Sequence, residues 1–247
     1  MVDILAGAKI IYTTGFFLAN SLECVLLLAR HAAEHNQVTF TLVQYRLADC
    51  CFLQTFVLNI SAPFIPRLHF SKFAAVFPFC DIVLGNDADA RSWAIVAGLQ
   101  PADAAAGSSS YLPLASIADT IASLPFDASK SSAAKRTVIL TNGPEPTVLT
   151  QSPGNFRTLT IVVPKVAADE VVDTNGAGDA FAGGLFAGLV LGKGLEESVA
   201  LGHRMGAMSV RHVSQIGCRV ALTVLTRGYF KVGPQYTFPK VDVLSDL

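Results

Sequence analysis

The stretch that decides the class of this chain is Asp173-Thr174-Asn175-Gly176-Ala177-Gly178-Asp179-Ala180-Phe181-Ala182-Gly183-Gly184. It leads from a β-rich segment into an apolar helix of small residues. Its glycines let the backbone approach a ligand closely, and the free N–H groups at a helix start form an anion site. Asp179 enters the first turn, where a carboxylate can accept a proton from an attacking hydroxyl. The stretch predicts phosphoryl transfer; the alternative is a helix cap and a turn without chemistry.

Short β-rich runs alternate with helix-like segments along the rest of the chain. This order predicts an α/β fold, with βαβ units on a mostly parallel sheet flanked by helices. We expect strands at 9–13, 55–60, 80–84, 137–141 and 158–163, and helices at 22–29, 87–97 and 114–124. Small and polar residues at 104–110 and 127–134 predict surface connections.

Polar and glycine-bearing segments follow four of these predicted strands. They are Gly15-Phe16-Phe17, Ser61-Ala62-Pro63-Phe64, Gly85-Asn86 and Asn142-Gly143. Ligands of an open parallel sheet bind beside the carboxyl ends of its strands. We therefore expect one edge of the sheet to collect Asn, Ser and Gly side chains in loops that face a ligand.

The composition narrows the classes of partner. The chain has 247 residues, of which 51% are hydrophobic and 15% charged, and its formal net charge is -1. Such a chain can bury a sizeable core and has no basic stripe for nucleic acid, so a small molecule is the expected partner. The mean hydropathy is +0.47, yet no apolar run reaches the ~18 residues of a spanning helix. Residues 1–9 lack the pattern of a signal peptide, which favours a soluble intracellular protein.

The cysteines argue against a metal site and against a disulfide framework. The five of them form an odd set without a C-x-x-C spacing: Cys24, Cys50, Cys51, Cys80 and Cys218. We expect buried free thiols.

The complete run Asp-Thr-x-Gly-Ala-Gly-Asp-x-Phe at 173–181 matches, at every fixed position, the signature of the ribokinase (PfkB) family of carbohydrate and nucleoside kinases. Further segments resemble the adenosine kinase branch rather than ribokinases or fructokinases: residues 15–18, 58–65, 85–86, 173–176 and 202–203. The resemblance implies a three-layer ribokinase-like fold and ATP-dependent phosphorylation of the 5′-hydroxyl of adenosine to AMP, a step of purine salvage. It also implies a cytoplasmic and nuclear location and a monomer in the complete family form. Two alternatives stay open, a PfkB-type sugar kinase and a non-catalytic fragment that binds nucleotide.

The resemblance implies roles for single positions. Gly176, Ala177 and Gly178 would form the anion hole, and Asp179 would take the proton from the 5′-hydroxyl. The ATP side would be lined by Asn59, Asn86, Thr141, Gly143, Asn175 and His203. Phe17 and Phe64 would face the nucleoside base. Taken alone, His203 and both phenylalanines are more typical of core residues.

Residues 86–89, Asn-Asp-Ala-Asp, resemble the family's Asn-x-x-Glu magnesium and phosphate motif but end in Asp89. The aspartate side chain is one methylene shorter than glutamate. Carboxylates and water suit Mg²⁺, so an added water would bridge the gap. We therefore expect Asp89 to contact Mg²⁺ beside the phosphates of ATP.

The chain departs from the family pattern in three places. The N-terminal third, with the residues that grip the ribose hydroxyls and the β-sheet lid, is expected to be missing. Residues 38–54 and 211–230 interrupt segments that are nearly continuous in the family. We interpret both as suspected insertions, with a retained intron translated in frame as the hypothesis and surface insertions as the alternative.

Overall fold

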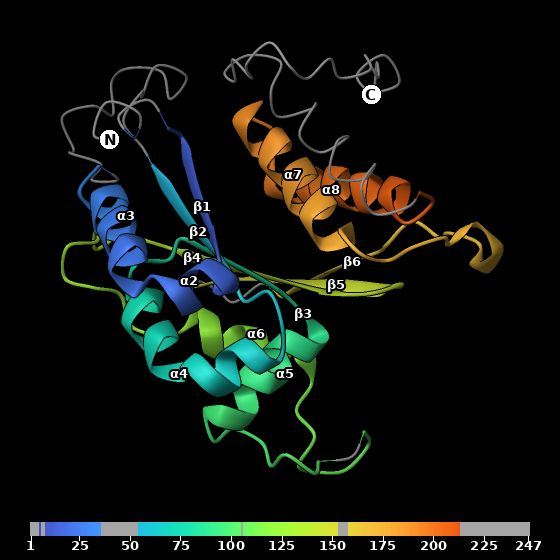
Figure 1. The fold of residues 1–247 in the computed structure, drawn as a ribbon, viewed down its shortest axis with the longest axis horizontal. Helices are drawn as coiled ribbons and strands as arrows, with labels where there is room; N and C mark the ends of the chain where they lie inside the picture. The colour runs from blue at the N-terminus through green and yellow to red at the C-terminus, as the bar shows by residue number, and fades with distance from the viewer. Residues whose placement is uncertain (1–4, 6–7, 36–53, 105, 153–157, 213–247) are drawn as a thin grey trace. The chain divides into compact units, whose positions relative to one another are not determined.

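The computed structural model describes residues 5, 8–35, 54–104, 106–152 and 158–212 (Figure 1). The chain divides into two compact units, Met1–Thr160 and Ile161–Leu247. The first contains nearly all of the sheet and the second contains a pair of long helices. Each unit is described by itself.

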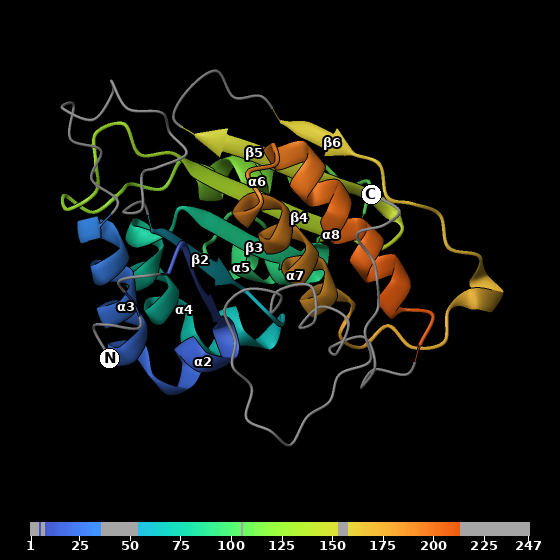
Figure 2. The ribbon, with the colours of Figure 1, turned by 90° about the horizontal axis from the view of Figure 1, so that it is seen from above.

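The sheet has six strands in the order β1-β2-β3-β4-β5-β6. Their bounds are β1 (Ile10–Thr14), β2 (Thr55–Asn59), β3 (Ile82–Asn86), β4 (Arg136–Asn142), β5 (Glu145–Ser152) and β6 (Leu159–Ile161). Strands β1 to β4 pair in parallel, and β5 pairs antiparallel with β4. Neighbouring strands in space are thus neighbours in sequence, as the view from above shows (Figure 2).

Helices cover one face of this sheet within the first unit (Figure 1). They are α2 (Gly15–Asn20), α3 (Leu22–His35), α4 (Phe64–Val76), α5 (Asp87–Val96) and α6 (Leu114–Ala122), with a short 3-10 helix η3 (Phe77–Phe79). Helices α3, α5 and α6 contact the strands, whereas α4 packs on α2, α3 and α5. The mixed α/β class predicted from the sequence is confirmed.

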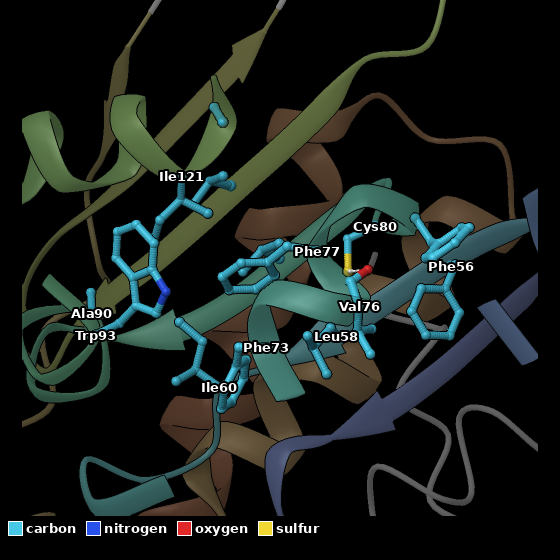
Figure 3. Close-up of a cluster of buried hydrophobic side chains, with 14 of the residues drawn as sticks. Phe56, Leu58, Ile60, Phe73, Val76, Phe77, Cys80, Ala90, Trp93 and Ile121 are labelled. Atoms are coloured by element: carbon cyan, nitrogen blue, oxygen red, sulfur yellow. Dashed lines mark hydrogen bonds between the residues drawn. The ribbon is translucent and has the colours of Figure 1, made fainter. Parts of the chain in front are cut away.

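The hydrophobic core lies between the strands and these helices (Figure 3). Alternate residues of β2 and the position after it, Phe56, Leu58 and Ile60, are fully buried. An aromatic row continues the core, with ring centroids 5.6 Å apart for Phe73–Phe77 and 6.0 Å apart for Phe77–Trp93. Burying each large apolar side chain contributes roughly 1.5–3 kcal/mol. The row therefore ties α4, η3 and α5 to the sheet.

Arg136, the first residue of β4, is fully buried and holds several segments together. Its guanidinium donates hydrogen bonds to six backbone carbonyls, those of Phe77, Cys80, Ile121, Ala122, Leu124 and Pro125. These acceptors satisfy a buried charge that would otherwise be very costly. Burial lowers the pKa of Arg136, and a guanidinium keeps its charge in proteins. The side chain thus fastens the ends of η3 and α6 to the start of β4.

The second unit is built on α7 (Ala177–Val190) and α8 (Leu195–Ser209), preceded by a 3-10 helix η4 (Ala168–Glu170). Glycines let these two helices approach closely. A Cβ at Gly184 would lie 2.8 Å from Gly202 Cα, and a Cβ at Gly202 would lie 2.8 Å from the Phe181 carbonyl oxygen. The small residues that made α7 recognisable as a helix in the sequence therefore form its packing seam.

The observed elements correct the sequence-based prediction in several places. Strand β3 was predicted at 80–84 but begins at Ile82, because Cys80 ends η3 and the Asp81 carboxylate accepts a hydrogen bond from Phe56 N–H at 2.9 Å. Strand β5 and helix α4 were not predicted. The segment 15–17 was expected as a loop but starts α2, whose N-cap, Thr14, accepts from Phe17 N–H at 3.3 Å.

The predicted connection at 127–134 consists of turns, yet part of it is buried. Lys130 is 8% exposed, and its Nζ lies 2.6 Å from Asp81 Oδ1. The connection is therefore anchored beside the start of β3 rather than lying wholly on the surface. The connection at 104–110 also consists of turns in its described residues.

Most of the two suspected insertions lies outside the described residues. Of 38–54 only Gln54 is described, and it is buried. Of 211–230, Arg211 and His212 are described and continue directly from α8. The origin of both segments stays a prediction.

The described cysteines confirm part of the thiol prediction. Cys80 is free and buried, and burial raises its pKa to about 12, which leaves the thiol unreactive. Cys24 is free but exposed, so the expectation of a buried thiol is wrong there, because it lies on the outer side of α3. Cys50, Cys51 and Cys218 lie outside the described residues. Among the helices of the described ranges, none has the length and apolar character needed to cross a membrane.

Candidate active site

The predicted polar edge of the sheet is present in the first unit. Asn59 ends β2 and Asn86 ends β3, and in the parallel register Asn86 pairs with Thr141 while Asn59 pairs with Leu84. Because β1 to β4 are parallel, these carboxyl ends meet at one edge. The structure therefore brings Asn59, Asn86 and Thr141 onto neighbouring strand ends, as expected from the sequence.

Asn59 is held by hydrogen bonds on both sides of its amide. Its Nδ2 donates to Tyr12 Oη at 3.0 Å, and its Oδ1 accepts from Ser61 N–H at 3.0 Å. The Ser61 backbone has φ +79°, a left-handed conformation that is uncommon for a non-glycine residue and often marks a functional turn. Ser61 Oγ also accepts from Gly15 N–H at 2.9 Å. Sequence reasoning placed Ser61 in a loop and assigned it no role.

The aromatic side chains of this edge point to solvent. Phe17 is 45% exposed and Phe64 is 52% exposed, so neither is a core residue. Phe64 forms an edge-to-face pair with Phe16, with ring centroids 6.0 Å apart. Phe16 itself was not selected from the sequence, although its position beside Phe17 in a Phe-Phe pair was the available signal. Together they offer aromatic surface on which a planar base can stack.

Asn86 and Asp89 form a reciprocal N-terminal cap of α5. Asn86 Oδ1 accepts from Asp89 N–H at 2.8 Å, and Asp89 Oδ2 accepts from Asn86 N–H at 3.1 Å. Asp89 is 1% exposed. Burial raises its pKa to about 6, against the smaller lowering effect of the Asn86 hydrogen bond. The capping interaction was not predicted, although an acid three residues after an Asn is a typical capping-box signal.

The remaining oxygen of Asp89 bears on the magnesium prediction. Oδ1 is buried and has no hydrogen-bond partner. An orphaned carboxylate oxygen fits a water-bridged contact to Mg²⁺, which takes one or two carboxylates and keeps several waters. Within the described residues, no group of three or more His, Cys, Asp or Glu side chains could hold a metal alone. Phosphate and water would have to supply the other ligands.

Gly143 occupies the turn between β4 and β5. Its φ is +55°, and a Cβ there would meet nothing within 4 Å. The backbone conformation rather than crowding therefore favours glycine at this position. Nearby, Thr141 Oγ1 donates to the Gly85 carbonyl at 3.4 Å.

In the second unit, the glycine-rich stretch forms the start of α7 as predicted. Gly176 is the N-cap residue with φ 77°, and the first helical hydrogen bond runs from Ala180 N–H to the Gly176 carbonyl at 2.9 Å. The N–H groups of Gly178 and Asp179 therefore have no acceptor within the helix. A Cβ at Gly178 would meet nothing within 4 Å. The turn therefore has two N–H groups without a helical acceptor and open space beside Gly178.

Asp179 and Asn175 lie on the exposed side of this turn. Asn175 N–H donates to Asp173 Oδ1 at 2.9 Å, which shapes the loop before the helix. The Asp179 carboxylate has no role in capping α7, because Gly176 is the N-cap residue and no side chain caps the helix. Asp179 thus makes no capping hydrogen bond, and the choice between a catalytic turn and a turn without chemistry stays a prediction.

His203 lies on α8 and is 6% exposed. Its ring packs against Phe181 with centroids 5.0 Å apart, and its Nε2 has no hydrogen-bond partner in the described structure. Burial lowers its pKa, so the imidazole is neutral at physiological pH. This environment matches an ordinary core histidine; a contact with ATP stays a prediction.

The PfkB family of carbohydrate kinases matches residues 1–221 of the chain. The chain belongs to this family.

The curated relatives that this chain resembles include adenosine kinases. The adenosine kinase of Schizophyllum commune is 34% identical over 94% of this chain and 54% of its own length. The adenosine kinase of Saccharomyces cerevisiae is 35% identical over 85% of this chain and 52% of its own length. This chain thus spans about half the length of these curated relatives.

Solved structures of adenosine kinases also resemble this chain. Anopheles gambiae adenosine kinase in complex with P1,P4-di(adenosine-5) tetraphosphate has a TM-score of 0.68 and 28% identity, covering 87% of this chain and 54% of that one. Schistosoma mansoni adenosine kinase in complex with 2-fluoroadenosine has a TM-score of 0.69 and 27% identity, covering 86% and 53%. The ribokinase-like fold predicted from the sequence is therefore confirmed.

Proposed function

We propose that this chain carries the ATP-binding and phosphoryl-transfer part of an adenosine kinase. The reaction is transfer of the γ-phosphoryl group of ATP to the 5′-hydroxyl of adenosine, giving AMP and ADP. Its similarity to adenosine kinases from two fungi supports the substrate assignment. The observation that carries the proposal is the exposed Asp179 carboxylate beside the open N–H donors of the α7 start.

In the proposed reaction, Asp179 accepts the proton of the 5′-hydroxyl while that oxygen bonds to the γ-phosphorus. The bond from the γ-phosphorus to the β–γ bridging oxygen breaks, and ADP leaves with that electron pair. The N–H groups of Gly178 and Asp179, at the positive end of α7, stabilise the charge on the transferring group. Gly176 and Ala177 shape the turn that presents them.

The first unit carries its own candidate residues for binding substrate. Phe17 and Phe64 offer exposed aromatic surface for the adenine of adenosine. Asn59, Asn86, Thr141 and Gly143 lie at the strand ends expected to face the triphosphate. Within the second unit, Asn175 and His203 are the residues that the resemblance assigns to ATP binding.

Mg²⁺, when bound, neutralises phosphate charge during transfer. Asp89 would hold it through water, since its Oδ1 is the orphaned acceptor in the Asn86–Asp89 cap. Asn86 would keep that carboxyl oriented through its N–H and its side chain. The cytoplasmic and nuclear location and the monomeric state stay predictions.

The test is direct detection of labelled AMP from γ-labelled ATP and adenosine, using the 247-residue chain with and without Mg²⁺. We expect labelled AMP only when Mg²⁺ and adenosine are both present. Ribose and fructose in place of adenosine provide the matched acceptors. Label transfer to a sugar in preference to adenosine would favour the sugar kinase, and ATP binding without transfer to any acceptor would favour the non-catalytic fragment.

A further inference from the structure

We propose that the ion pair between Glu170 and Arg211, which we call the clamp, positions the glycine-rich turn by fastening the segment before it to the end of α8. This inference rests on the proposed function in assigning chemistry to that turn. The clamp itself is defined by contacts within the second unit. Arg211 and Glu170 are thus positioning residues that act through Asp173–Asp179 without touching a substrate.

The pair has two-point geometry. Arg211 Nε lies 3.3 Å from Glu170 Oε1, and Arg211 Nη2 lies 3.2 Å from Glu170 Oε2. Such a side-on arrangement of guanidinium and carboxylate fixes the orientation of both groups, which a single contact would not do. The Arg211 hydrogen bond is also the main cause that lowers the pKa of Glu170, so the carboxylate is charged at neutral pH.

Each partner is attached to a different element. Glu170 ends η4, and its Oε2 also accepts from Ala167 N–H at 3.2 Å. Arg211 follows the C-terminal end of α8, and its Nη1 donates to the Ala207 carbonyl at 3.3 Å. The clamp therefore joins η4 to the last turn of α8 across 41 positions of sequence.

Backbone hydrogen bonds continue this attachment toward the turn. The Val210 carbonyl accepts from Val172 N–H at 2.8 Å and from Asp173 N–H at 3.2 Å. Asp173 Oδ1 in turn accepts from Asn175 N–H at 2.9 Å. A continuous path of contacts thus runs from the clamp to the residue before Gly176.

The far side of the turn is held by the same helix. Asp179 lies in the first turn of α7, and α7 packs on α8 through Gly184 and Gly202. The three residues from Thr174 to Gly176 therefore lie between two attachments to α8 and its C-cap residue. Because catalytic groups need placement within about 0.5 Å, release of one attachment is expected to loosen the donors at Gly178 and Asp179.

Both side chains of the clamp are partly exposed, at 38% for Arg211 and 47% for Glu170. Exposed ion pairs contribute little to global stability. We therefore expect removal of the clamp to change local order and ligand binding while leaving the melting temperature nearly unchanged. Removal of an ion pair that does not hold the turn would change neither local order nor ligand binding.

Hydrogen–deuterium exchange of the complete chain tests the clamp without any substrate. We expect E170Q and R211M each to raise the exchange rates of the Val172 and Asp173 amides about tenfold, with α7 amides after Phe181 unchanged. The doubly swapped variant E170R/R211E should restore slow exchange. Two matched controls replace exposed residues of α8 that lie outside the clamp, E196Q and R204M, and both should behave as wild type.

Equal exchange rates of the Val172 and Asp173 amides in wild type, E170Q and R211M would overturn the clamp.

ATP titration of the same variants then tests whether the clamp positions the turn. Severalfold weaker ATP binding by R211M, recovered in the swapped variant, supports it, and unchanged affinity overturns it. If the wild-type chain binds no ATP, the proposed function fails, while the exchange measurement still decides whether the clamp holds the turn.

Discussion

The two compact units, the sheet unit Met1–Thr160 and the helical unit Ile161–Leu247, differ in how their candidate site residues are hydrogen-bonded. In the sheet unit, Asn86 and Asp89 direct their side chains at each other's backbone, and Asn59 is held by Tyr12 and Ser61. In the helical unit, Asp179 and the N–H of Gly178 are left open.

The difference shows two ways of positioning polar groups. The first unit uses hydrogen bonds among the site residues themselves. The second unit places the first turn of α7 by close packing of α7 on α8, while the Gly178 and Asp179 N–H groups have no acceptor within the helix. If this comparison is correct, the largest changes in global stability will come from charge-changing substitutions in the first unit and from volume changes in the second.

The largest loss of stability is expected for R136M in the sheet unit. The variant removes the donor of six carbonyl hydrogen bonds, most of them buried. The Phe77 and Ile121 carbonyls keep backbone N–H donors, those of Cys80 and Leu124. We expect the free energy of unfolding to fall by about 3–5 kcal/mol. Urea denaturation followed by circular dichroism measures it. R30M, at an exposed arginine of α3, should change it by less than about 0.5 kcal/mol, and an equal effect of both variants would show that Arg136 has no special role.

Removing the Asp89 charge should stabilise the protein in a pH-dependent way. The folded pKa of about 6 lies above the ordinary 3.8, so the folded state holds the proton more tightly than the unfolded state. Wild-type stability should therefore fall as pH rises from about 4 to about 6, by roughly 3 kcal/mol in all. D89N keeps an acceptor for Asn86 N–H and lacks this loss.

Unfolding free energies of wild type and D89N from pH 4 to 8 measure this effect. The curves should separate as pH rises and stay parallel above about pH 7, with D89N the more stable. Reduced Mg²⁺-dependent transfer in the stabilised variant would identify Asp89 as a group kept for function at a cost in stability. Parallel curves across the whole range would refute the buried-carboxyl account.

In the helical unit, G202A should lower stability by about 1–3 kcal/mol. The new methyl group would lie 2.8 Å from the Phe181 carbonyl oxygen, and a backbone atom cannot move aside cheaply. The matched variant G178A adds the same methyl where nothing lies within 4 Å. Its melting temperature should equal or slightly exceed that of wild type, since alanine favours a helix. Similar losses in both variants would contradict the packing seam.

The sequence predicted much of the fold because its signals are local. Strands β1, β2 and β4 lie within a residue or two of their predicted bounds, and the glycine-rich stretch starts α7. Strand β5 was missed although Asn142-Gly143 is a turn signal followed by the alternating run from Thr147. The glutamate and the proline at its start, Glu145 and Pro146, concealed the strand.

The candidate site was only partly predictable, because side-chain contacts depend on residues far apart in sequence. The positions of Asn59 and Asn86 at strand ends followed from the parallel order. The left-handed Ser61 beside Gly15, the aromatic contact of Phe16 and the clamp could not be deduced, since each joins segments that only folding brings together.

The measurement that tests the central assignment most directly compares D179N with wild type in phosphoryl transfer from ATP to adenosine, alongside ATP affinity by calorimetry. Asparagine cannot accept the proton of the 5′-hydroxyl, so kcat should fall about 10²- to 10⁴-fold while ATP affinity changes by less than about twofold. The control E196Q, at an exposed glutamate of α8, should match wild type in both. Unchanged turnover in D179N would contradict the assignment of Asp179 as the catalytic base.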